Sequence, residues 1–92
     1  MDAGRPLRKS GLISQKIGDE CMLYDPAKGS MHVINGTAEF VLNLCDGTRS
    51  LNEIEQQVLE AHQVPEGIHI RRHLENILHN FTELGIIQTQ VP

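Results

Sequence analysis

The sequence predicts an α+β domain in which a three-stranded antiparallel meander precedes three helices. Three short apolar runs, separated by two tight-turn signals, occupy the first part of the chain. From about residue 36 onward, apolar residues instead recur at spacings of three and four, as helices require. The 92 residues suffice for one domain. We expect it to span residues 11–88, after a polar, flexible N-terminal tail over residues 1–10.

The strands are expected at residues 12–17, 21–24 and 31–34. Gly18-Asp19 separates the first two, and glycine at the first central position suits a two-residue type II′ hairpin turn because it tolerates a positive φ. Between the second and third strands, Asp25 opens a turn, Pro26 presets φ and Gly29 closes the turn. Two tight turns between three runs predict an antiparallel meander.

Each helix has a recognisable boundary signal. Gly36 and Glu39 have the spacing of an N-cap and its third helical residue, and this first helix should end near residues 46–47. Ser50 and Glu53 match a capping box at the start of the second. Gly85 fits the left-handed position after the third helix. That helix has an apolar stripe at helical spacing: Ile70, Leu74, Ile77, Phe81 and Leu84.

Composition narrows the function classes. Twelve acidic and eight basic side chains give a net charge of −4, which argues against nucleic acid, since non-specific affinity for it depends on Lys and Arg. Cys21 and Cys45 lie in apolar surroundings and are read as buried thiols in a reducing compartment. We find no secretory signal and no stretch long enough to span a membrane, so we expect a cytoplasmic protein.

The third strand is a candidate binding edge. Edge strands leave N–H and C=O groups unpaired, and soluble proteins usually protect them with charge or proline. Residues 31–34 contain neither. Either the fold covers this edge internally or a partner does: an extended peptide could add to it as a fourth strand, and a second copy of the chain could pair with it.

The third helix offers a second candidate surface. Leu78 lies at one margin of its apolar arc, and Arg71 and Glu75 continue outward on the same side. An apolar margin flanked by both signs of charge suits a groove for an amphipathic peptide. The alternative is a helix that is buried along a broad stripe and solvated on its other face.

Four segments together resemble the PqqD-like family of small leader-peptide-binding proteins, also called RiPP recognition elements. The resemblance covers about residues 11–87. It rests on His32-Val33-Ile34-Asn35-Gly36-Thr37-Ala38, Val41-Leu42, Leu44-Cys45-Asp46-Gly47 and Leu51-x-x-Ile54.

This resemblance implies a winged helix-turn-helix-like fold and a non-catalytic protein that captures the leader of a ribosomally made precursor peptide. The leader would pair with the third strand, in the cleft between that strand and the third helix. Carried over by position, the peptide-binding residues are Met31, His32, Val33, Ile34, Arg71, Leu74, Glu75 and Leu78. The implied partner enzyme is a radical-SAM protein, as in pyrroloquinoline quinone biosynthesis, or a leader peptidase, as in lasso-peptide pathways. No cofactor is implied.

Other constellations are weaker. His69 and His73 have a spacing that can bind metal, but nothing completes a metal motif, so we predict no metal site. Cys45 could be a nucleophile, but its place on an apolar helical face favours a packed thiol, and we predict no enzyme. The alternative function is a winged-helix DNA-binding regulator that contacts phosphates through Arg71 and Arg72.

Overall fold

The computed structural model describes residues 4–62 and 69–90. Its elements, in chain order, are β1 (Arg5–Arg8), β2 (Ile13–Ile17), β3 (Glu20–Asp25), β4 (Ser30–Asn35), α1 (Gly36–Leu44), α2 (Leu51–Ala61), α3 (Ile70–Leu84) and β5 (Ile87–Gln90). Strands β2, β3 and β4 form an antiparallel sheet in that order, and three helices follow, which confirms the predicted fold class. None of the helices in the described residues is long and apolar enough to cross a membrane.

The two predicted turns join the strands of this sheet. Ile17 pairs with Glu20, so Gly18-Asp19 is a two-residue loop, and Gly18 has a φ of 57°. Asp19 has no positive φ, which matches a type II′ turn and excludes type I′. The second turn is closed by a hydrogen bond in which the Gly29 N–H donates to the Asp25 carbonyl at 2.7 Å.

Helix boundaries follow the local signals with one difference. Asn35 caps α1, because its side-chain oxygen accepts from the Ala38 N–H at 2.8 Å, whereas the expected Gly36 has no side chain to do so. The capping box of Ser50 and Glu53 starts α2 as predicted. Gly85 ends α3 in the left-handed conformation, with a φ of 76°.

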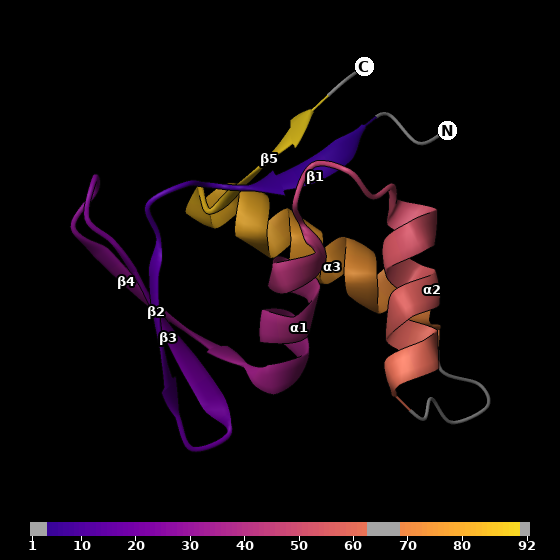
Figure 1. The fold of residues 1–92 in the computed structure, drawn as a ribbon, viewed down its shortest axis with the longest axis horizontal. Coiled ribbons are helices and arrows are strands. Elements are labelled where there is room, and N and C mark those ends of the chain that lie inside the picture. Colours follow the sequence, from indigo (N-terminus) through magenta and orange to yellow (C-terminus); the bar gives the residue numbers. More distant parts are fainter. Residues whose placement is uncertain (1–3, 63–68, 91–92) are drawn as a thin grey trace.

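The N-terminal segment differs from the expected loose tail. Arg5–Arg8 form β1, which pairs antiparallel with β5, so two strands from opposite ends of the sequence lie side by side (Figure 1). The Arg8 N–H also donates to the Cys45 carbonyl at 2.7 Å, and the Lys9 N–H to the Ile86 carbonyl at 2.9 Å. These bonds join residues far apart in sequence, so local sequence patterns carried no signal for them.

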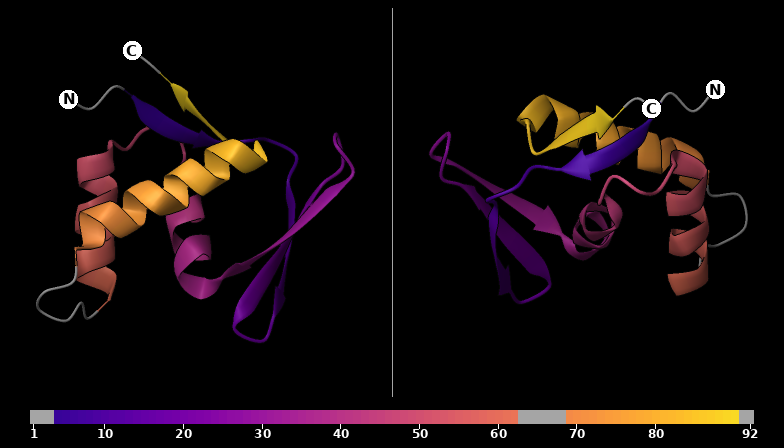
Figure 2. Two further views of the ribbon diagram at one scale, coloured as in Figure 1. Left: turned by 180° about the vertical axis from the view of Figure 1, so that it is seen from behind. Right: turned by 45° about the horizontal axis from the view of Figure 1, so that its top comes forward.

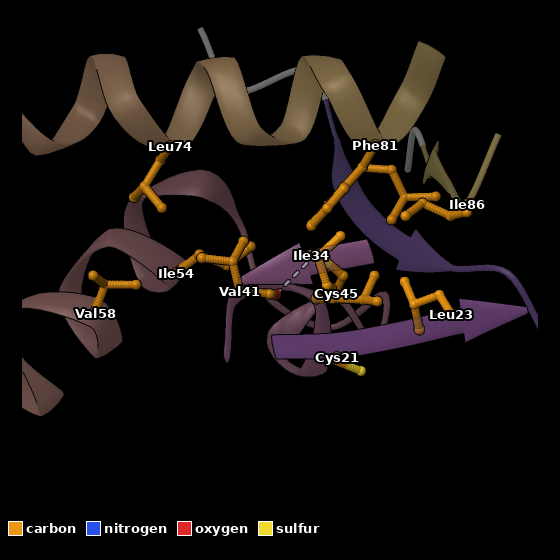
Figure 3. Close-up of a cluster of buried hydrophobic side chains, with 12 residues drawn as sticks. Cys21, Leu23, Ile34, Val41, Cys45, Ile54, Val58, Leu74, Phe81 and Ile86 are labelled. Carbon is orange, nitrogen blue, oxygen red and sulfur yellow. Dashed lines mark hydrogen bonds between the residues drawn. The ribbon is translucent and has the colours of Figure 1, made fainter. Parts of the chain in front are cut away.

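The helices and the β2–β3–β4 sheet meet at one hydrophobic core, from which the sheet extends away (Figures 1 and 2). Figure 3 shows Leu74 and Phe81 pointing from α3 toward Ile54, Val41 and Ile34. The buried apolar residues are Cys21, Leu23, Ile34, Val41, Leu42, Cys45, Ile54, Val58, Leu74, Phe81, Ile86 and Ile87.

Candidate peptide-binding groove

A groove of about 690 Å³ lies between β4 and α3. The strand and the start of α1 contribute Val33, Ile34, Asn35, Thr37 and Ala38. The helix contributes Ile70, His73, Leu74, Ile77, Asn80, Phe81, Glu83 and Leu84. Most of these side chains are apolar, whereas His73, Asn80 and Glu83 are exposed polar residues on the helix. This mixture suits a ligand that buries apolar side chains.

Side chains of β4 alternate between the two faces of the sheet. Ile34 is buried against the core and His32 is half-buried on the same inner face, opposite Leu23. Met31 and Val33 point to the outer face and are 59% and 61% exposed. A strand pairing along β4 would therefore direct alternate side chains toward the groove and toward the outer face.

The strand register also determines which backbone groups face the free edge of β4. In a two-residue hairpin, the residues that flank the loop, here Ile17 and Glu20, form a hydrogen-bonded pair. Hydrogen-bonded and non-hydrogen-bonded pairs alternate, so Cys21 and Leu23 direct their N–H and C=O groups toward β4. Their partners in β4 are Ile34 and His32. Met31 and Val33 therefore direct their N–H and C=O groups away from β3, toward the groove.

Helix α3 presents one margin of its apolar arc to the groove beside β4 and the other margin to α2. Leu74 and Phe81, near the middle of the apolar arc, are 0% and 2% exposed. One margin of the arc, with Ile77 and Leu84, lines the groove. The other margin carries Arg71, and there the guanidinium reaches toward α2.

Arg71 is held by two residues of α2. Its Nε donates to Glu55 Oε1 at 3.1 Å, and a second guanidinium nitrogen lies 3.0 Å from the same oxygen. It also bonds to the Asn52 side chain. This arrangement ties the N-terminal end of α3 to α2 on the side away from the groove.

The structure thus brings together part of the predicted site. Val33, Ile34 and Leu74 line the groove, and Met31 lies on its free edge. The other predicted helix residues, Arg71, Glu75 and Leu78, are not among the lining residues, because the groove lies on the opposite flank of α3.

Sequence reasoning missed seven groove residues on α3, namely Ile70, His73, Ile77, Asn80, Phe81, Glu83 and Leu84. The four apolar ones were recognised only as members of the apolar stripe. The stripe has two margins, and helical spacing does not say which of them faces the sheet. The positions of α2 and β4 decide this.

Two further candidates from the sequence are Cys45, as a nucleophile, and His73, as a metal ligand. Cys45 is 1% exposed, its thiol donates to the Val41 carbonyl at 3.3 Å, and burial raises the pKa of this thiol to about 12. The thiol is therefore protonated and inaccessible, as expected for a packed cysteine. His73 lines the groove, and within residues 4–62 and 69–90 no three His, Cys, Asp or Glu side chains are grouped to hold a metal ion.

Comparisons with known proteins give two matches. The sequence profile of the family described as "Coenzyme PQQ synthesis protein D (PqqD)" matches residues 20–87. The fold is similar to the solved structure of TbiB1 in complex with the TbiA(beta) leader peptide, with a TM-score of 0.73 and 15% sequence identity over 94% of this chain and 99% of that chain. No curated protein sequence matches significantly.

Proposed function

This chain belongs to the PqqD family, and from that premise we propose that it captures the leader segment of a ribosomally made precursor peptide for a separate maturation enzyme. The similarity of its fold to TbiB1, solved with a leader peptide, supports the proposal. The observation that carries it is the free edge of β4, which borders an apolar groove against α3.

The proposed binding mode is addition of the leader as a fourth strand. Met31 and Val33 supply the outward N–H and C=O groups that such a strand needs. Peptide residues opposite His32 and Ile34 direct their side chains into the groove, toward Ile77. Backbone pairing supplies affinity, and alternate apolar side chains in the groove supply specificity.

We further propose that the protein acts by binding alone and works in the cytoplasm. The buried, protonated thiol of Cys45 supports binding without catalysis, since only a thiolate is an effective nucleophile. The enzyme served is a radical-SAM protein or a leader peptidase, and a short precursor gene beside this chain's gene, together with a gene for one of these two enzymes, would identify which. Duplex DNA is not favoured as a ligand, because Arg71, one of its two proposed phosphate contacts, is paired with Glu55.

The test compares two adjacent, half-buried aliphatic residues of α3. Ile77→Ala removes a groove side chain and should weaken leader binding by about 1–3 kcal/mol, or roughly 5- to 150-fold. Leu78→Ala should leave the affinity within about twofold, because this residue lies outside the groove. Fluorescence anisotropy with a labelled synthetic leader of the neighbouring precursor measures both.

Each variant also controls for folding of the other, since both lose part of a half-buried aliphatic side chain. Thermal melts should show comparable, modest losses of stability. If Leu78→Ala, Arg71→Ala and Glu75→Ala weakened binding while Ile77→Ala did not, the peptide would lie on the flank that the sequence first suggested.

A further inference from the structure

The outer face of the β2–β3–β4 sheet is an exposed apolar surface. Among the described residues, seven large apolar side chains are well exposed, and five of them are on this face: Ile13, Ile17, Tyr24, Met31 and Val33. The strand registers place Ile13, Tyr24 and Met31 in one row across the sheet. Met22 and Val33 lie in the next row, and Ile17 in the row after that. Such a contiguous arrangement differs from the scattered exposed apolar residues that monomers normally tolerate.

Strand β2 indicates that this face is covered in the working molecule. Ile13 and Ile17 point outward, whereas Ser14 and Lys16 point to the side of the helices, where the Lys16 ammonium lies 2.9 Å from Glu39 Oε1. An antiparallel strand with one solvated side normally turns its apolar side to the protein interior. β2 does the reverse, and Figure 2 shows no helix over its outer side.

A leader peptide does not cover this surface. The proposed peptide strand adds beside β4, and β3 separates β4 from β2. With strands about 4.8 Å apart, Ile13 and Ile17 lie roughly 14 Å from the added strand. Whatever covers them must pack on the face itself.

We propose that two copies of this chain pack their outer sheet faces against each other. The registers place three residues of each strand on the face, and of these nine Glu20 alone is charged. A partner rich in charge would gain no complementary contact there. A second copy supplies a mostly apolar surface of the same size with a single charge, and aligned packing of two such sheets is a common two-layer arrangement.

The size of the face predicts a weak dimer. Three strands of five residues cover a footprint of roughly 14 Å by 17 Å. This is well below the area that each partner buries in a standard stable interface, about 800 Å². We therefore expect reversible dimerisation with a Kd in the range of about 10 µM to 1 mM. The β4 edges stay free, so each copy can still bind a leader.

Sedimentation equilibrium of the full chain over about 10 µM to 2 mM tests the proposal. The wild-type weight-average mass should rise with concentration above the monomer mass of 10.3 kDa. Ile13→Lys should remove the rise, because it places one cation from each copy in the apolar face. Ser14→Lys is the matched control: Ser14 is the next residue, is also exposed and points to the other side, so its mass should rise as in wild type.

Both variants change exposed residues, and their melting curves should resemble that of wild type. A wild-type protein that is monomeric throughout would refute the proposal and leave the face to a different protein, such as the maturation enzyme. Association that survives Ile13→Lys would also refute it. Equal loss in Ile13→Lys and Ser14→Lys would show that the effect does not depend on this face.

Discussion

Replacing either of two adjacent residues of β4 by proline should separate peptide binding from folding. Proline removes one N–H donor and restricts φ. In Val33→Pro the lost N–H is one that faces the groove, so no bond to β3 is broken, and the side chain replaced is 61% exposed. In Ile34→Pro the lost N–H faces β3, and the side chain replaced is 8% exposed in the core.

The expected magnitudes follow from these surroundings. A backbone hydrogen bond contributes about 0.5–1.5 kcal/mol net, and leaving the peptide's carbonyl unpaired in the groove adds to the loss. Val33→Pro should therefore weaken leader binding by about 1–3 kcal/mol, or roughly 5- to 150-fold, with a small cost in stability. Ile34→Pro combines a broken sheet bond with a disrupted core, and should cost about 3 kcal/mol or more in stability.

Two measurements decide the outcome. Calorimetric titration with the synthetic leader gives the affinity, and thermal unfolding followed by circular dichroism gives the stability. A loss of 3 kcal/mol lowers the Tm of a domain of this size by roughly 12–24 °C. If Val33→Pro binds the leader as wild type does, the peptide is not paired at Val33. If Val33→Pro unfolds the protein while Ile34→Pro does not, the assigned alternation of edge-facing groups is wrong.

Two further predictions concern buried groups. Lys9, whose Nζ lies 2.7 Å from Asp25 Oδ2, holds the pKa of that buried carboxyl below its usual range, so the pair stabilises the fold above about pH 4 and the contribution is lost as the pH falls through the lowered pKa. Lys9→Met should therefore lower the Tm near neutral pH, and its difference from wild type should shrink as the pH falls below about 4; a constant difference would contradict the assignment. The pKa of about 12 for Cys45 leaves a thiolate fraction of about 10⁻⁴ at pH 8, against about one quarter for an ordinary thiol, so iodoacetamide should modify this residue only after unfolding in urea, as mass spectrometry would show. Rapid modification in the folded protein would show that the thiol is accessible.

The sequence predicted the features that depend on a few neighbouring residues. The Gly18-Asp19 turn, the Ser50–Glu53 capping box and the left-handed Gly85 are each local conformational preferences, and all three are present in the structure. The uncharged composition of residues 31–34 likewise identified the edge strand. With the two turns in place, the order of strands in the sheet follows from chain connectivity.

The tertiary structure decided which surfaces meet. Pairing of β1 with β5 joins the two ends of the chain, and a short Arg-Pro-Leu-Arg segment has no strong preference for a strand until β5 lies beside it. The flank of α3 that faces the groove was also beyond the sequence, because Ile77 and Leu78 are both aliphatic and border the same apolar stripe. Helical periodicity fixes the angle between these residues but not the direction of either. The packing of α3 against α2, with Arg71 held by Glu55, turns Ile77 toward β4 and so determines the site.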